Sequence, residues 1–225
     1  WIGARTSVNP FAIQEIADAL KGVDIPVMVK NPINPDVDLW QGAIERIAGA
    51  GIDKIGAIHR GFSSFDKTKY RNIPKWQLPI ELRRRMPEIP MICDPSHIAG
   101  RRDLIEKVSQ KSLDLNYDGL MIECHNSPDE AWSDAKQQVS PSQLKEILDN
   151  LVLREVVIND ASIQDLEELR AQIDAHDKKL FSLLESRMAV AEKIGEFKKA
   201  HNITVLQPER WQAILDKTIE EGKKH

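Results

Sequence analysis

The first two thirds of the chain alternate between short apolar runs and longer segments with apolar residues at helical spacing. Helical spacing is clearest in Pro10–Leu20, Leu39–Ala50 and Leu104–Ser112. Near-continuous apolar strands that alternate with helices are typical of a parallel sheet covered by helices on both faces. The pattern therefore predicts an α/β fold for this part. The apolar runs are residues 1–6, 25–32, 54–62, 89–97 and 119–125.

Each apolar run ends in polar or charged residues, which packing alone does not explain. In folds of this class the carboxyl ends of the strands lie at one edge, where substrates bind. We favour the C-terminal part of a (β/α)8 TIM barrel over an open sheet, because an open sheet would not need a polar ending on every strand. The chain opens on Trp1 within a strand-like run, so we expect the first strands of the barrel to precede it. The endings are Arg5, Lys30 with Asn31, His59 with Arg60, His97, and Glu123 with His125.

The character of the sequence changes after about residue 157. Residues 159–200 contain no proline and a single glycine, Gly195, and their apolar residues recur at helical spacing. This pattern predicts one helix of about forty residues, roughly 60 Å long at 1.5 Å per residue. A second helix should begin at Pro208 and run to the chain end. We expect a barrel domain at 1–153 and an all-α domain at 160–225, whose long helix no small domain buries unaided.

Composition narrows the possible partners. The chain of 225 residues is 41% apolar and has a net charge of −4, from 31 basic and 35 acidic side chains. This balance argues against a general affinity for nucleic acid or for an anionic membrane. No apolar run approaches the ~18–20 residues of a membrane span. Because Cys93 and Cys124 lie in apolar runs, we expect both to be buried thiols of a soluble, cytoplasmic protein.

A candidate metal site combines His97, Glu123 and Asp134. One imidazole with two carboxylates suits a divalent ion such as Mn, Fe, Zn or Co and leaves positions open for a substrate oxygen. For a single histidine, a buried and hydrogen-bonded structural role is the more frequent explanation. Two strand ends that deliver ligands to one mouth favour the metal.

Two groups of cations are candidates for anion binding. Arg5, Lys30 and Arg60 each follow an apolar run, and guanidinium groups bind phosphate and carboxylate bidentately. Arg187 and Lys198 are eleven residues apart, and so they project from one apolar face of the long helix. The alternatives are ordinary surface charge for the first group and side chains that snorkel from the edge of a coiled coil for the second.

The motifs "GART", "VKNP", "HRGF", "DPSH", "MIECH" and "SDAKQQ", in this order, resemble the 3-deoxy-D-arabino-heptulosonate-7-phosphate (DAHP) synthase family in its shorter microbial form, from Trp1 to about Pro141. The resemblance implies a (β/α)8 barrel that condenses phosphoenolpyruvate with erythrose 4-phosphate. A ligand cysteine and a Lys-Pro-Arg motif of the family are expected upstream, so this chain alone should not make DAHP. The proton-transfer residue stays open among Asp94, His125 and His59. By this resemblance His97, Glu123 and Asp134 are metal ligands, Arg5, Lys30 and Arg60 hold phosphoenolpyruvate, and Asn31 with Pro32 lies near the aldose.

The segment "LRAQIDAHDKKLFSLLESRMAVAEKIGEFKK", followed by "PERW", resembles the all-helical class of chorismate mutase, from Ser162 to the chain end. The resemblance implies that Arg187, Lys198 and Arg210 bind the carboxylates and the ether oxygen of chorismate. It also implies an intertwined homodimer in which Arg170 reaches the partner's site. Gln207 falls at a substrate-binding position where aspartate is common, and the last helix of the family is expected beyond His225.

Together these patterns predict a bifunctional shikimate-pathway enzyme in which a product such as prephenate regulates DAHP synthesis. The alternative is a related phosphoenolpyruvate-aldose synthase whose helical part is a non-catalytic dimerisation or regulatory module. Aldose preference and turnover of chorismate would separate the two.

Overall fold

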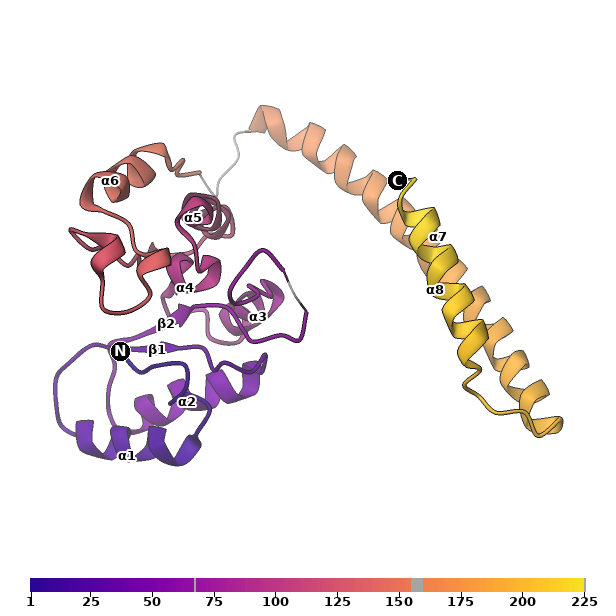
Figure 1. The fold of residues 1–225 in the computed structure, drawn as a ribbon, viewed down its shortest axis with the longest axis horizontal. Helices are drawn as coiled ribbons and strands as arrows, with labels where there is room; N and C mark the ends of the chain where they lie inside the picture. The colour runs from indigo at the N-terminus through magenta and orange to yellow at the C-terminus, as the bar shows by residue number, and fades with distance from the viewer. Residues whose placement is uncertain (67, 155–159, 225) are drawn as a thin grey trace. The chain divides into compact units, whose positions relative to one another are not determined.

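The computed structural model describes residues 1–66, 68–154 and 160–224. The chain divides into two compact units, Trp1–Val156 and Val157–His225 (Figure 1). The predicted linker between the two domains, Leu153 to Asn159, lies mostly outside the described residues. None of the described helices is both long and apolar enough to cross a lipid bilayer.

The first unit is built on a four-stranded parallel sheet with strand order β1-β2-β3-β4. Successive strands pair directly, with Val27 opposite Ile55, Ala57 opposite Met91, and Ile92 opposite Gly119. This arrangement confirms the predicted parallel α/β architecture. The strands are β1 (Val27–Lys30), β2 (Ile55–His59), β3 (Met91–Cys93) and β4 (Gly119–Leu120).

Three of the predicted strands differ from the structure, and one of them, the run 119–125, is a strand only at Gly119–Leu120. The run 1–6 contributes only a parallel bridge between Ile2 and Val29, and a turn follows. The run 89–97 leaves the sheet after Cys93, because Asp94 caps the short helix α4 (Pro95–Ala99) and Pro95 occupies its first position. His97 therefore lies on a helical turn just beyond β3.

Helices connect the strands and cover the sheet, and several of them begin with a side-chain cap. Asn9 caps α1 (Pro10–Leu20), and Asp36 caps α2 (Val37–Gly49). Both helices agree with the predicted segments to within two residues at each end. The further helices are α3 (Gln77–Arg85), α5 (Ile105–Asp114) and α6 (Pro141–Asn150), with 3-10 turns η1 (Arg102–Leu104), η2 (Pro128–Glu130) and η3 (Ala135–Gln137).

A buried histidine at the end of β2 belongs to the core. The His59 ring packs among Trp40, Phe62, Trp76 and Tyr117. A carbonyl can only accept, so Nε2 of His59 donates to the Pro74 oxygen at 2.7 Å, while Nδ1 accepts from the Tyr117 hydroxyl at 2.9 Å. Burial lowers the pKa of His59 to about 4. This histidine is neutral at pH 7 and has both ring nitrogens occupied by the fold.

The two cysteines differ in their surroundings. Cys93 is buried in β3, as expected, and burial raises the pKa of its thiol. Cys124 is exposed, which contradicts the expectation that both thiols are buried. The reason is that β4 ends at Leu120, and the chain beyond it bridges only to Val139.

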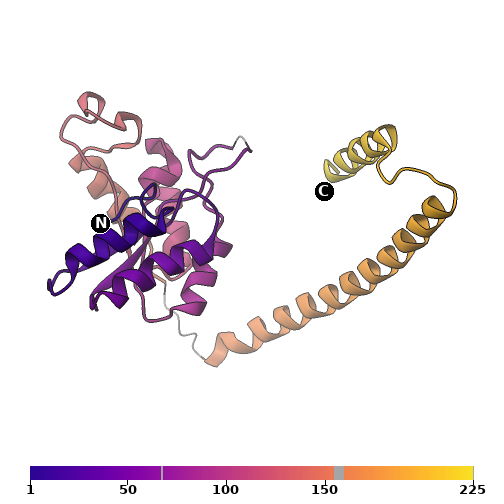
Figure 2. The ribbon, with the colours of Figure 1, turned by 90° about the horizontal axis from the view of Figure 1, so that it is seen from below.

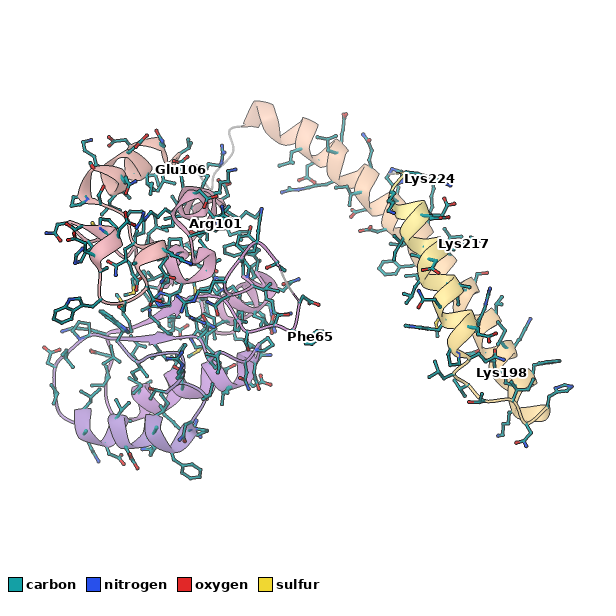
Figure 3. The ribbon with its side chains drawn as sticks, viewed as in Figure 1. Phe65, Arg101, Glu106, Lys198, Lys217 and Lys224 are labelled. Atoms are coloured by element: carbon teal, nitrogen blue, oxygen red, sulfur yellow. The ribbon has the colours of Figure 1, made fainter. Side chains whose placement is uncertain are left out.

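The second unit consists of the long helix α7 (Asp160–Ala200) and the helix α8 (Pro208–Gly222), as predicted (Figure 2). The chain reverses direction near Asn202, which has a φ of +54°, and Lys198 Nζ donates to the Val205 carbonyl across this turn at 2.8 Å (Figure 3). Large apolar side chains on both helices are exposed, including Leu180, Leu184, Ile194, Trp211 and Ile219.

Two glycines let one loop of the first unit approach the sheet closely. Gly61 (φ +79°) and Gly100 (φ +68°) lie against Asn72 and Arg71, and a Cβ atom on Gly100 would stand 2.4 Å from the Cβ atom of Arg71. The backbone N–H of Arg71 donates to the Ile98 carbonyl at 3.1 Å. Only glycine combines this conformation with this proximity.

We predict that Gly100→Ala destabilises the protein more than a matched substitution at Gly51. Gly51 also has a positive φ (+92°), but a Cβ atom there would meet nothing within 4 Å. Both substitutions incur the left-handed penalty of about 1–2 kcal/mol, and the clash with Arg71 should add roughly 1–3 kcal/mol. Urea unfolding of the two variants measures the difference. Equal losses of stability in the two variants would show that the loop around Arg71 moves away from a Cβ atom at Gly100 at little cost in free energy.

Candidate functional site

A buried carboxylate at the end of β3 orients the candidate ligand His97. Asp94 accepts from the backbone N–H of His97 at 3.0 Å and from its ring Nδ1 at 2.9 Å, and its Oδ2 accepts from Lys30 Nζ at 2.7 Å. Because Nδ1 donates to a carboxylate, the lone pair of the neutral ring is on Nε2. Burial raises the pKa of Asp94, but the hydrogen bonds and charges of His97 and Lys30 outweigh it, and the net shift is downward. His97 therefore presents a ligand atom away from Asp94.

The three predicted metal ligands converge. Nε2 of His97 lies 3.8 Å from Glu123 Oε1 and 4.0 Å from Asp134 Oδ2, and one atom of each residue falls within 4.8 Å of the others. Ligand atoms bound to one ion at about 2.0–2.2 Å lie roughly 3–4 Å apart. His97 comes from α4, Glu123 from the segment after β4, and Asp134 from the residue that precedes η3. The donor set and its spacing fit a divalent cation.

The far sides of the two carboxylates are bonded to the protein. Gln137 Nε2 donates to Glu123 Oε2 at 2.6 Å, and Arg71 Nη1 donates to Asp134 Oδ1 and to Gln137 Oε1, each at 2.7 Å. The hydrogen bond from Arg71 is the main reason why the pKa of Asp134 lies below its ordinary value. Neither Arg71 nor Gln137 was predicted from the sequence. Their sequence context, a charged loop and a Gln-Gln pair, carried no signal that would distinguish them.

The predicted anion-binding cations differ in how their charges are compensated. Lys30 is paired with Asp94, whereas Arg60 forms no ion pair with any described residue and donates from Nη1 to the amide oxygen of Asn72 at 2.8 Å. Burial lowers the pKa of Arg60, the charge of Asp94 opposes this, and the charges of Arg71 and Arg5 lower it further. Arg60 is thus a partly buried cation whose side chain donates to a neutral amide and not to a carboxylate among the described residues.

Hydrogen bonds of Asn31 join the backbone segments that carry Lys30 and Arg60. The Asn31 amide donates to the carbonyls of Pro32 and Gly61 at 2.7 and 2.8 Å, and its oxygen accepts from the backbone N–H of Arg60 at 2.7 Å. These bonds join the end of β1 to the end of β2. Arg5 is exposed and lies in the turn after Ile2. The proposed contact of Asn31 and Pro32 with the aldose stays a prediction.

The three candidates for proton transfer, His59, His125 and Asp94, differ in burial and in how far their polar atoms are already bonded within the protein. His59 is buried in the aromatic core, as described above. Nδ1 of His125 accepts from the backbone N–H of Ser127 at 3.0 Å, and the side chain is partly exposed. Asp94 is 1% exposed and already bonded to two cationic or donor side chains. This arrangement favours a positioning role for Asp94.

In the helical unit, Lys198 and Gln207 line one shallow groove with apolar side chains. Arg170 pairs with Glu167 on the same helix. Arg187 and Arg210 are exposed, form no ion pair with a described residue, and do not contribute to the described lining of this groove. The structure thus brings together Lys198 and Gln207 out of the five residues predicted for this unit. The groove is lined by Val190, Lys193, Ile194, Phe197, Lys198, Ile203 and Gln207.

Comparison with known proteins assigns both parts of the chain. Residues 1–160 match the DAHP synthetase I family, and residues 169–225 match chorismate mutase type II. The phospho-2-dehydro-3-deoxyheptonate aldolase of Thermotoga maritima is 29% identical over 150 residues, which cover 67% of this chain and 43% of that protein. The bifunctional chorismate mutase/prephenate dehydratase of Aquifex aeolicus is 36% identical over 61 residues, which cover 27% of this chain and 17% of that protein.

A solved structure supports the first assignment. The crystal structure of the Thermotoga maritima DAHP synthase superimposes with a TM-score of 0.58 at 29% identity, covering 66% of this chain and 42% of that one. The chain therefore spans less than half the length of this relative. Since the family model matches well over half of the chain, the chain belongs to the DAHP synthetase I family and carries a chorismate mutase type II domain at its C-terminal end.

Proposed function

We propose that this chain is the catalytic edge of a DAHP synthase barrel fused to a chorismate mutase, in a bifunctional enzyme of the shikimate pathway. The observation that carries the proposal is the convergence of His97, Glu123 and Asp134 near Arg60, which forms no ion pair with a described residue. The barrel would condense phosphoenolpyruvate with erythrose 4-phosphate, and the helical domain would convert chorismate to prephenate. We place the enzyme in the cytoplasm, where the free thiols of Cys93 and Cys124 persist.

His97, Glu123 and Asp134 would hold a divalent ion, with Mn, Fe, Zn and Co as candidates. When bound, such an ion supplies a Lewis acid that polarises the aldehyde oxygen of erythrose 4-phosphate. The fit rests on the donor set, because Asp94 leaves Nε2 of His97 free to act as a ligand.

The cations of the site would orient phosphoenolpyruvate. Arg60 and Arg5 offer guanidinium donors to its phosphate and carboxylate, and Lys30 adds a charge at the end of β1. Binding by several fixed cations holds the methylene carbon towards the aldehyde and lowers the entropic part of the barrier. A new bond joins that carbon to the aldehyde carbon, water adds to the enol ether carbon, and phosphate leaves.

The helical domain would act without a covalent step. Arg187, Lys198 and Arg210 would bind the carboxylates and ether oxygen of chorismate, with Gln207 at the substrate and Arg170 contributed to a partner. The exposed apolar side chains of α7 and α8 support a homodimer, because burial of such a face on a second copy is favourable. Fixed cations would select the compact conformer of chorismate and stabilise charge on its ether oxygen.

We predict that His97→Ala abolishes condensation in a protein that contains this chain within a complete barrel. The substitution removes a metal ligand, whereas the mutase residues lie in the other unit, and so chorismate turnover should be largely unchanged. Assays of DAHP and prephenate formation on one preparation test both statements. Normal, metal-dependent formation of DAHP by the variant would remove His97 from the site.

We predict that Arg187→Ala lowers chorismate turnover by about a hundredfold, or roughly 3 kcal/mol, as is typical for the loss of one charged contact in the transition state. The melting temperature should change little, because Arg187 is exposed and alanine is the best helix former. Lys179→Ala, which removes a cation from the same helix, is the matched control and should keep full turnover. If Arg187→Ala also retains turnover, the mutase assignment of this residue is wrong.

We predict feedback between the two activities, because both belong to one pathway and are joined in one chain. Prephenate bound at the helical site should slow DAHP synthesis, and by linkage the barrel substrates should weaken prephenate binding. Arg187→Ala should relieve the inhibition if it weakens prephenate binding. An unchanged rate of DAHP synthesis at saturating prephenate would exclude this regulation.

A further inference from the structure

Each candidate carboxylate ligand uses its two oxygens differently. Glu123 Oε1 faces His97 Nε2 at 3.8 Å, while Oε2 accepts from Gln137 at 2.6 Å. Asp134 Oδ2 faces the same nitrogen at 4.0 Å, while Oδ1 accepts from Arg71 at 2.7 Å. The oxygens that face His97 converge, and the oxygens on the far side are both bonded to the protein.

Arg71 and Gln137 are themselves joined, since Arg71 Nη1 donates to Gln137 Oε1 at 2.7 Å. We propose that this pair consists of positioning residues that hold Glu123 and Asp134 in the geometry required to bind a divalent metal ion. The inference rests on the metal site of the proposed function. It assigns a role to two side chains that donate to the ligands without facing His97.

The chemistry of Gln137 suits this role better than that of other residues of its size. Its side chain is buried, at 1% exposure, and an amide has one accepting and one donating end. The accepting end meets the Arg71 guanidinium, and the donating end meets the Glu123 carboxylate, so the amide can bind in one orientation only. A methionine would fill the same space without either bond.

The guanidinium of Arg71 counters the repulsion between the converging carboxylates. Two carboxylates near one histidine repel each other before a cation binds, and a guanidinium bonded to one of them, Asp134, reduces this cost. Residues that bond to metal ligands from behind fix their orientation and typically contribute 10–100-fold to metal affinity. The pair thus keeps the ligand oxygens in place before the ion arrives.

Both members of the pair are supported by the fold. Close packing against Gly100 fixes the backbone at Arg71, which donates to Ile98. Arg102 donates to the backbone oxygens of Ala135 and Gln138 at 2.7 and 2.5 Å, which secures the turn that carries Gln137. The pair of Arg71 and Gln137 is therefore held by two segments that are far apart in the sequence.

The test is titration with Mn²⁺ of a protein that contains this chain within a complete barrel. Binding is measured by calorimetry and by the electron paramagnetic resonance signal of free Mn²⁺. Wild type should bind one ion, and His97→Ala should not bind. Gln137→Met and Arg71→Met should weaken binding by about 10–100-fold. Gln138→Met is the matched control, because its amide donates only to the Ser133 carbonyl, at 2.8 Å, and it should bind as wild type does.

The outcomes separate the two proposals. Binding by Gln137→Met and Arg71→Met at wild-type affinity, with His97→Ala inactive in binding, would overturn the positioning role and leave the metal site intact. No binding by wild type, or equal binding by His97→Ala, would overturn the metal site and the inference with it. If the buried Gln137→Met fails to fold by circular dichroism, Arg71→Met decides, because the Arg71 side chain is 46% exposed and its loss leaves the core unchanged.

Discussion

The buried carboxylate of Asp94 is the interaction on which the barrel site depends. Asp94 lies between Lys30 at the end of β1 and His97 in α4, and its own backbone N–H donates to the His59 carbonyl at 2.8 Å. Removing one partner from such a buried pair typically costs about 3–5 kcal/mol, because the other charge remains desolvated. The carboxylate thus compensates a lysine and selects the tautomer of the candidate metal ligand, while the backbone of Asp94 joins the end of β3 to the end of β2.

The cations of the site differ in whether a carboxylate pairs with them. Lys30 and Arg71 are held by Asp94 and Asp134, whereas Arg60 has no carboxylate partner among the described residues. The paired cations orient the candidate metal ligands, and in the proposed function Arg60 would bind an anion. Neighbouring residues contact both groups, since Arg71 donates to the candidate ligand Asp134, while Asn72 accepts from Arg60 and donates to the His97 carbonyl. One short loop therefore contacts both Arg60 and the candidate metal ligands.

Sequence patterns predicted the features that depend on residues close together in the chain. Apolar runs identified the strands in their parallel order, and polar strand endings identified His97 and Glu123 as neighbours. Asp134, grouped with them from a segment outside the strands, also converges on His97. The helix α4 was missed although Asp94 and Pro95 are a cap and a first helical residue, because the apolar run before them favoured a strand. Arg71 and Gln137 had no comparable signal. Their roles follow from the close approach of a loop to Gly100 and from an amide orientation, which exist only once distant segments are packed.

In the helical domain, too, the sequence predicted the elements but not what contacts them. Helical spacing predicted α7 and α8, but a spacing pattern specifies which face of a helix is apolar and not what covers that face. In the structure the apolar residues of α7 remain exposed, and Lys198 satisfies the Val205 carbonyl instead of an anion. In the proposed mutase site a substrate carboxylate would replace that neutral carbonyl, since a charge-assisted bond is roughly twice as strong as a neutral one. The turn between the helices therefore holds Lys198 in a position from which an anion can displace its present partner.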